Sequence, residues 1–250
     1  MTINSFKKMK NGKYKLMIDN NEELILYEDI IIKYNLLINK KLNEELLKKI
    51  NEDNYYYSIY NDALKYISKK MRSRKDITKY LLKKYNNDNT VHEVVKNLVC
   101  KNIVNDVEFC KSFVNDKIHL SNYGLDKIKY LLHEHEIEDN VINEITNNID
   151  LDIIRDKLYK QIGKYIKQNK KYSGNVLKGR VINHFTNNGH NKNVIVEIFD
   201  SLEIKPDKEV AKREYEKLYA KYSKKYSGYK LENFIKSKLY QKGFSDKDLE

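Results

Sequence analysis

The sequence predicts a mainly α-helical protein of tandem three-helix repeats that form an elongated curved solenoid, preceded by a small N-terminal head that contains a β-hairpin. The first observation is an apolar pair, four residues apart, that recurs about every 52 residues. The second is a set of apolar positions at fixed offsets after each pair, and the third is a single proline among 250 residues. A period of this length indicates stacked helical units, each of which contacts mainly its neighbours.

The apolar pairs define the second helix of each repeat, and the later positions define the third. The pairs are Ile77 and Leu81, Ile128 and Leu132, Val181 and Phe185, and Ile235 and Leu239. The positions that follow them are Val91, Val94 and Leu98, then Ile142, Ile145 and Ile149, then Ile195, Ile198 and Leu202, and finally Leu249. Spacings of three, four and seven residues place such side chains on one stripe of a helix.

An amphipathic segment ahead of each pair supplies the first helix of the repeat. These segments cover residues 57–70, 107–118, 151–170 and 207–226. The chain therefore divides into a head at 1–54 and repeats at 55–104, 105–149, 150–204 and 205–250, with the third helix of the last repeat truncated. In that repeat we expect Ser245 and Asp248 to form a capping box, with Leu249 at a core position.

The head combines a predicted hairpin with short helices. Tyr14, Leu16 and Ile18 alternate with Lys15, Met17 and Asp19, residues 19–21 read Asp-Asn-Asn, and a second strand follows to residue 27. This is the pattern of a β-hairpin. Residues 28–35 form a short helix or a loop. Asn43 then caps a helix that ends near Glu52, and Asp53 and Asn54 form the junction to the first repeat.

Local signals place the ends of the repeat helices. Ser73, with Asp76 three residues later, predicts a helix start, and Pro206 suits a first helical turn. Gly189 and Gly243 each follow a second helix, where a left-handed residue is wanted. The second repeat is expected to start at Asp106 and to carry an apolar stripe of Val107, Cys110, Phe113, Val114 and Ile118, which makes Cys110 a small core residue.

The composition is basic and polar. Lys and Arg number 48 against 36 Asp and Glu, for a formal net charge of +12, which favours acidic partners such as nucleic acid or a membrane surface. The heavy use of Asn, Ile, Lys and Tyr also fits a nucleotide-composition bias, which raises lysine content without selection for binding. No apolar run approaches the roughly 20 residues of a membrane span, the first ten residues lack a signal-peptide centre, and two cysteines fit a reducing compartment. We expect a cytoplasmic protein with no membrane partner.

No pattern of residues indicates catalysis. His133 and His135 are two apart on a helix and point to different faces, and Cys100, Cys110 and His92 lack zinc-ligand spacing. The sequence has no G-x-x-x-x-G-K-[ST] phosphate loop and no dinucleotide fingerprint. We therefore expect no enzyme activity, no cofactor and no metal site.

Basic residues on the second helices are the candidate binding residues, because most lie away from the apolar stripe. They are Arg74, Lys75, Lys79, Lys83, Lys127, Lys129, Lys178, Arg180, Lys236 and Lys238, with Lys242 nearby. Stacking would align them into a surface for a phosphate backbone or an acidic filament groove; the alternative is a solvated lysine-rich face. Residues 55–57 are three tyrosines, for which packing at a repeat junction is favoured over stacking on single-stranded bases.

Three successive segments of the chain resemble a known family: ALKYISKKMRSRKDITKYLLKKY, NLVCKNIVNDVEFCKSFVND and YGLDKIKYLLHEHEI. They resemble the RecX family of RecA regulators, in which a Ser-initiated second helix is followed by an acidic-then-aromatic entry, here Asp106, Phe109 and Phe113. The head, including YNLLINKKLNEELLKKI, resembles longer Gram-positive-type members, so the resemblance covers nearly the whole chain. The glycine that commonly ends the second helix is replaced by Tyr85 and by Glu136, which leaves the geometry of those turns open.

The resemblance implies tandem three-helix repeats and a regulator that binds RecA and RecA-DNA filaments and inhibits RecA in homologous recombination, DNA repair and the SOS response. It implies no catalysis, and we expect a monomer. The ten basic residues are then candidates for contacts with RecA or DNA. Two alternatives remain: a helical-repeat protein that binds single- or double-stranded DNA itself and competes for the strand, and a scaffold that binds only proteins.

Overall fold

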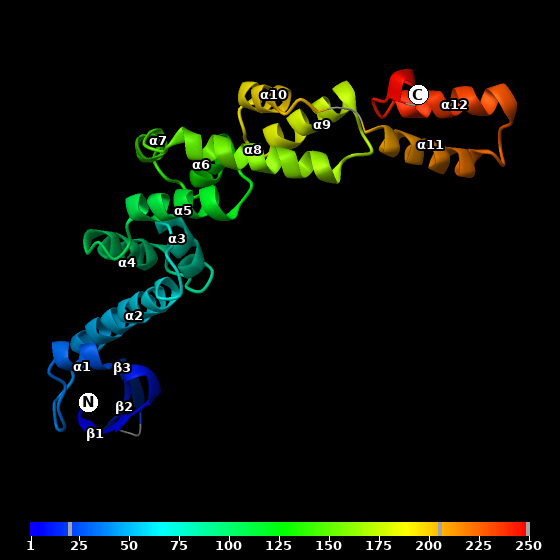
Figure 1. Cartoon of the computed structure of the whole chain (residues 1–250). Coiled ribbons are helices and arrows are strands. Elements are labelled where there is room, and N and C mark those ends of the chain that lie inside the picture. The colour runs from blue at the N-terminus through cyan, green and yellow to red at the C-terminus, as the bar shows by residue number, and fades with distance from the viewer. Residues whose placement is uncertain (20–21, 205–206, 249–250) are drawn as a thin grey trace. The chain divides into compact units, whose positions relative to one another are not determined.

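The computed structural model describes residues 1–19, 22–204 and 207–248, and the chain forms two compact units, Met1–Phe109 and Cys110–Glu250. Within the described residues the fold is mainly helical, with one small antiparallel sheet at the N-terminus, as the sequence predicts (Figure 1). The N-terminal unit contains strands β1 (Ile3–Lys8), β2 (Lys13–Ile18) and β3 (Glu23–Tyr27), and helices α1 (Glu28–Lys33), α2 (Glu44–Ile67), α3 (Arg74–Leu82) and α4 (Asp88–Cys100).

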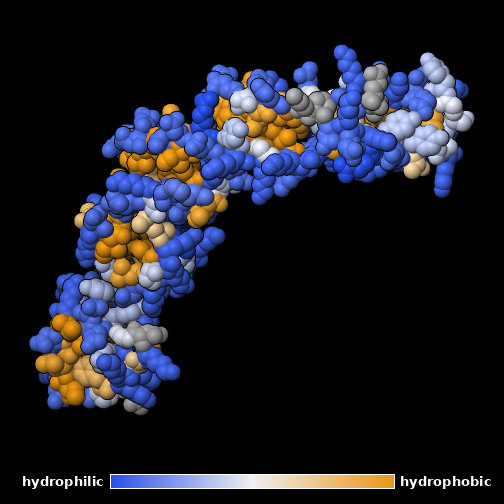
Figure 2. Space-filling view, viewed as in Figure 1, coloured by the Kyte–Doolittle hydropathy of each residue, from blue (hydrophilic) through white to orange (hydrophobic). Residues whose placement is uncertain are grey.

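Helix α5 (Asp106–Leu120) begins at the end of the N-terminal unit and continues into the C-terminal unit. The remaining helices are α6 (Leu125–Glu134), α7 (Asp139–Asn147), α8 (Leu151–Gln168), α9 (Gly174–Asn187), α10 (Lys192–Ser201), α11 (Lys208–Tyr222) and α12 (Gly228–Tyr240). The described residues also contain the short 3-10 turns η1 (Lys10–Gly12) and η3 (Asp246–Asp248). On the face that Figure 2 shows, hydrophilic residues cover most of both units, as a charged fraction of 34% requires.

The head is a three-stranded sheet in the order β1-β2-β3, so the predicted hairpin of β2 and β3 is confirmed. Strand β1 is an addition that the sequence pattern does not indicate, because its residues Ile3–Lys8 include only two large apolar side chains. Ile3, Leu16 and Leu26 are fully buried beneath the sheet. The predicted turn at residues 20 and 21 lies outside the described residues.

Helix α2 corrects the expected end of the last helix of the head. Asn43 caps it as predicted, accepting a 2.8 Å hydrogen bond from the Leu46 N–H, but the helix does not end near Glu52; it continues without a break to Ile67. The reason lies in Asn54, which the sequence places at the junction to the first repeat. Its side chain accepts from the Tyr27 N–H at 3.1 Å and donates to the Ile25 carbonyl at 2.9 Å. These bonds satisfy edge groups of β3 and hold the helix against the sheet.

The apolar pairs of the repeats form the cores as predicted, since all eight side chains are at most 2% exposed. Cys110 is fully buried, also as predicted. Val107 is a correction, because it is 40% exposed and Phe109 is buried in the same helix. In α7 the expected core position Ile145 is only half-buried, and the adjacent Thr146 is buried, its hydroxyl donating to the Ile142 carbonyl at 2.7 Å.

Several predicted caps are present. Ser73 Oγ accepts from the Asp76 N–H at 3.1 Å, and Asp248 accepts from the Ser245 N–H at 2.6 Å. Gly189 and Gly243 have φ of 80° and 91°, the left-handed conformation expected after the second helix. Glu136 adopts the same conformation with φ of 56°, whereas Tyr85 does not. The predictions for Pro206 and Leu249 lie outside the described residues.

Glycines join successive repeats in the C-terminal unit. The N–H of Gly124, at the start of α6, donates to the Asn188 carbonyl at 2.8 Å, and a Cβ built on Gly124 would lie 2.2 Å from the Gly189 oxygen. At the next junction the Ser173 N–H donates to the Lys242 carbonyl at 2.8 Å, and a Cβ on Gly243 would lie 2.0 Å from the Ser173 oxygen. In each case the turn that follows the second helix of one repeat packs against the start of the second helix of the preceding repeat.

Candidate functional site

The basic residues of α3 are the most available of the predicted binding residues. Lys79 and Lys83 are exposed, and their ammonium groups have no ion-pair or hydrogen-bond partner among the described residues. Arg74 is exposed, but its Nε lies 3.7 Å from Asp106 Oδ2, and its N–H donates to Asp106 Oδ1 at 2.8 Å. Asp106 therefore caps the start of α3 as well as beginning α5. Lys75 is half-buried.

The candidates on α6 and α9 make local contacts. Lys127 Nζ lies 4.6 Å from the centroid of the Tyr130 ring, and Lys129 donates to Asn143 at 3.4 Å. Lys178 forms an ion pair with Asp200 at 2.7 Å, and Arg180 stacks 3.7 Å above the Tyr172 ring. Cation–π contacts leave the cation's other N–H groups free to donate, so Lys127 and Arg180 keep donors for a partner.

The candidates on α12 are also paired within the fold. Lys236 lies 3.3 Å from Asp246, and Lys238 donates to Gln241 at 3.1 Å. Lys242 forms a 2.6 Å ion pair with Glu214, which is only 10% exposed and also pairs with Lys217. The role of Lys242 is thus to neutralise a buried carboxylate. The ten candidates remain a prediction, in which Lys79 and Lys83 have the fewest competing contacts.

The N-terminal unit contains a basic cavity that the sequence pattern does not predict. Its volume is about 790 Å³, and it lies between the β1–β2 connection and the first repeat. Six lysines line it: Lys7, Lys8, Lys10, Lys13, Lys65 and Lys84. Four of them are visible in the sequence as a cluster between residues 7 and 13. Their approach to α2 and to the turn after α3 depends on tertiary structure and has no local sequence signal.

One carboxylate stands in the wall of this basic cavity. Asp62 is 16% exposed; it forms an ion pair with Lys84 and accepts a 2.6 Å hydrogen bond from the Tyr85 hydroxyl. Burial opposes ionisation of Asp62, but the hydrogen bonds from Lys84 and Tyr85 outweigh it and hold the carboxyl pKa below its usual range. The same contact raises the pKa of Lys84, and burial together with the Asp62 carboxylate raises the pKa of Tyr85. All three groups therefore keep their usual protonation states at neutral pH.

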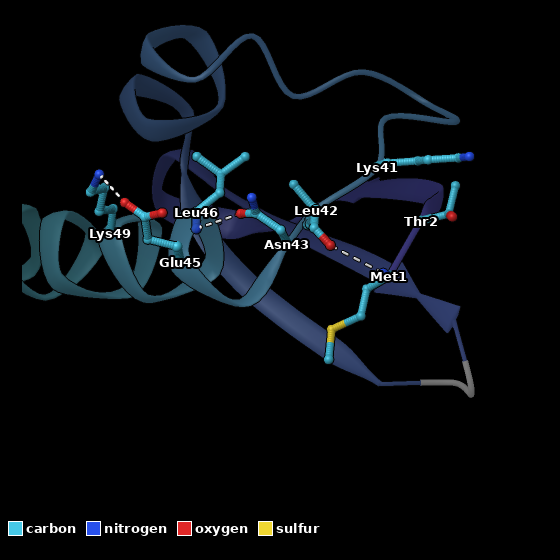
Figure 3. Close-up of a pocket in the computed structure, with 8 residues that line it drawn as sticks. All are labelled: Met1, Thr2, Lys41, Leu42, Asn43, Glu45, Leu46 and Lys49. Carbon is cyan, nitrogen blue, oxygen red and sulfur yellow. Dashed lines mark hydrogen bonds and ion pairs between the residues drawn. The ribbon is translucent and has the colours of Figure 1, made fainter.

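A second cavity, of about 720 Å³, lies where the chain start meets the beginning of α2 (Figure 3). Its polar groups are already used by the fold. The Met1 amine donates to the Leu42 carbonyl at 3.1 Å, Asn43 caps α2, and Glu45 pairs with Lys49 at 2.8 Å. This cavity consequently offers fewer free groups to a ligand than the basic cavity does.

Residues considered for metal binding are dispersed. No group of three or more His, Cys, Asp or Glu side chains comes together as a possible metal site in the described part of the chain. His133 lies 3.2 Å from Asp139, and Cys100 is exposed while Cys110 is buried. None of the helices in the described ranges is both long and apolar enough to cross a membrane.

The tyrosines at 55–57 pack within the fold, as favoured from the sequence. Tyr55 and Tyr56 pack against the core of the first repeat and Tyr57 against the core of the head. The Tyr55 ring meets the Tyr85 ring edge-on at 5.9 Å. These half-buried rings bridge the two cores along α2.

Comparison with known proteins extends along the whole chain. Residues 60–98 match the family model described as RecX, first three-helix domain. A "Regulatory protein RecX" of Streptococcus agalactiae is 28% identical over 100% of this chain and 97% of its own length, and one of Streptococcus pneumoniae is 29% identical with the same coverage. This chain is therefore similar to RecX proteins along its whole length. Its relatives are regulatory proteins by name, which gives the family a regulatory role.

Solved structures of RecX proteins share the fold. A crystal structure described as regulatory protein RecX covers 80% of this chain and 98% of its own, with a TM-score of 0.68 and 20% identity. A RecX structure from Lactobacillus salivarius covers 59% of this chain and 96% of its own, with a TM-score of 0.54 and 21% identity. The family match spans 60–98, which begins inside α2 and ends within α4.

Proposed function

We propose that this protein binds RecA and RecA-DNA filaments and inhibits the recombinase and ATPase activities of RecA in homologous recombination, DNA repair and the SOS response. The observation that carries the proposal is the match to regulatory RecX proteins over the full length of the chain. As part of the same proposal, the protein acts as a monomer in the cytoplasm, and stoichiometric binding replaces catalysis.

Repeated helical units suit a partner that is itself a repeating polymer. Each repeat presents a second helix with similar chemistry, so several weak contacts to successive RecA subunits would act together, and multivalency raises the overall affinity. Inhibition requires only that the protein bind one state of the filament more tightly than another. No reactive group is needed for that effect.

We propose that the ten basic residues of the second helices make the contacts with RecA or DNA. Lys79 and Lys83 are the central pair, because both are exposed and neither ammonium group is engaged within the described residues. Lys127 and Arg180 contribute donors that their ring contacts leave free. Arg74, Lys178 and Lys236 would have to exchange a carboxylate partner for the filament, so we expect smaller contributions from them.

A second candidate function is direct binding to single-stranded DNA, with any effect on RecA arising from competition for the strand. The observation that favours it is that Lys79 and Lys83 have no ion-pair partner among the residues that the structure describes, together with a net charge of +12. Such binding weakens steeply with added salt, because it releases counterions from the phosphates.

One titration separates the two functions. RecA ATP hydrolysis on single-stranded DNA and RecA strand exchange are measured while this protein is added at ratios well below one per RecA, and its own DNA affinity is measured in the same buffer. The proposal predicts loss of RecA activity at salt where binding to bare DNA is negligible. Inhibition that begins only when the protein saturates the DNA would support the competing function.

A further inference from the structure

The basic cavity of the N-terminal unit concentrates positive charge at one place. Lys7 and Lys8 come from β1, Lys10 and Lys13 from the connection to β2 and its start, Lys65 from α2 and Lys84 from the turn after α3. Against these six ammonium groups stands one carboxylate, Asp62, so the lining carries a net charge of five. Asp62 forms an ion pair with Lys84, and the charge of Lys65 also stabilises this carboxylate. The five lysines other than Lys84 form no ion pair with a carboxylate within the described ranges.

Like charges held around a concave surface repel one another and raise the local concentration of anions. The arrangement is therefore favourable only when solvent ions or a ligand neutralise the charge. The position of Lys84 is fixed by Asp62 and by its contact with the Tyr85 ring, 5.6 Å from Nζ to the centroid. Lys7, Lys10 and Lys65 are exposed long side chains that can turn toward a bound anion.

We propose that this cavity binds a ligand that carries several adjacent phosphate groups. A cavity of about 790 Å³ lies within the usual range for small-molecule sites, about 300–1,000 Å³. Lysine ammonium groups are point charges with three donors each, which match the oxygens of phosphates without demanding one fixed geometry. Since the site needs several anionic groups close together, a single inorganic phosphate would engage only part of it.

The aromatic side chains of the cavity are already occupied. Lys13 Nζ lies 4.7 Å from the Tyr27 ring centroid, and the Tyr85 hydroxyl is bonded to Asp62. Neither ring is free to stack on a base, which is the usual way that proteins hold single-stranded bases. Recognition would therefore act through the phosphates and would be independent of base identity. Two sources have this chemistry: a nucleoside polyphosphate and successive phosphodiesters of a nucleic acid strand.

The test uses the full-length protein alone, so it is independent of the proposed action on RecA. Inorganic triphosphate, ATP and an eight-residue oligothymidylate are titrated separately at low ionic strength, with binding measured by calorimetry and by the NMR shifts of backbone amides at residues 7–13. The pocket variant is Lys7→Gln, Lys10→Gln and Lys65→Gln together. The matched control is Lys208→Gln, Lys212→Gln and Lys230→Gln, which removes the same charge from exposed positions of the C-terminal unit.

The proposal predicts that triphosphate binds the parent protein, that the pocket variant weakens binding by about tenfold or more, and that the control weakens it by less than about twofold. Parallel behaviour of ATP identifies the nucleotide as the source, whereas tighter binding of the oligothymidylate identifies the strand. If triphosphate affinity falls equally in both variants, net charge alone explains the effect, and this result would overturn the proposal. So would the absence of binding by all three probes, with folding of both variants verified by circular dichroism.

Discussion

The backbone N–H of Gly124 donates a 2.8 Å hydrogen bond to the carbonyl of Asn188, which lies in the following repeat. The Asp126 N–H reinforces it with a 3.2 Å bond to the Gly189 carbonyl. Two otherwise unpaired donors at the start of α6 are thereby satisfied by the turn after α9. The junction between these repeats is set by main-chain contact at a distance that leaves no room for a Cβ.

Replacing Gly189 with alanine should destabilise the C-terminal unit. A left-handed conformation costs a non-glycine residue about 1–2 kcal/mol, and the new Cβ would lie 2.3 Å from the Lys127 nitrogen. We expect a loss of about 2 kcal/mol or more, measured by urea denaturation. Gly163→Ala is the matched control: Gly163 lies inside α8 with no atom within 4 Å of a built Cβ, so it should gain up to about 1 kcal/mol.

Equal effects of these two alanine substitutions would contradict the role of the junction. The comparison is informative because both exchanges add the same methyl group and remove the same chain entropy from the unfolded state. Only the local conformation and the neighbouring atoms differ.

His190 should make the C-terminal unit less stable in mild acid. Its Nε2 lies 3.0 Å from the Asn122 carbonyl, and burial lowers the pKa of the imidazole below 6.5. The Asn122 carbonyl and Asp126 act in the opposite direction, while Lys157 and His184 add to the lowering. As pH falls below about 6.5, the unfolded chain takes up a proton that the folded chain does not, so stability declines until the folded pKa is reached.

The measurement for His190 is urea denaturation at about pH 7.5 and pH 5.5. His190→Gln should reduce the difference in stability between the two, because the titrating group is gone. His92→Gln, at an exposed position in α4, should leave the difference as it is in the parent protein. An unchanged difference in the His190 variant would show that other groups cause the acid sensitivity.

Asp62→Asn should destabilise the N-terminal unit at neutral pH by about 1 kcal/mol, a figure discounted because Lys84 is half exposed. The Asp62 carboxyl has a lowered pKa, so its contribution is complete above the unfolded value of about 3.9 and is lost as pH falls through the folded pKa. The variant should accordingly show a smaller loss of stability in that acidic window. Asp116→Asn, on an exposed face, should change stability by less than about 0.5 kcal/mol and keep the parent pH dependence.

Lys79→Glu with Lys83→Glu should weaken inhibition of RecA by about tenfold or more, because two cations that lack a partner within the described ranges become anions. Thermal stability should change little, since both side chains are exposed. The charge-matched control is Lys208→Glu with Lys212→Glu on α11. If the control variant loses inhibition to the same extent, the effect comes from net charge, and Lys79 and Lys83 are not specific contact residues.

The repeat architecture is readable from the sequence because burial is periodic. Ile77, Leu81 and their equivalents are core residues, and the left-handed glycines follow where the chain must turn. Continuity of α2 is not readable in this way. Asn54 looks like a breaker because its side chain competes for backbone bonds, and only the neighbouring β3 converts it into an acceptor and donor across the interface.

The partners of the basic residues cannot be predicted from the sequence. A lysine count cannot tell that Lys178 is engaged by Asp200 while Lys79 has no ion-pair partner in the described part of the chain, because ion pairs join residues on different helices. The basic cavity is a further case, since Lys10 and Lys65 are brought together by the packing of the head on α2. Helix phase predicts which side chains are exposed, whereas their partners depend on tertiary contacts.

The most direct test of the central claim is binding of the labelled protein to preassembled RecA filaments on single-stranded DNA, compared with the same DNA without RecA. Fluorescence anisotropy is followed at an ionic strength that abolishes binding to bare DNA. The proposed function predicts saturable binding to the filaments, weakened in the Lys79→Glu, Lys83→Glu variant. Absence of filament binding at that ionic strength, with binding only to bare DNA at low salt, would contradict it.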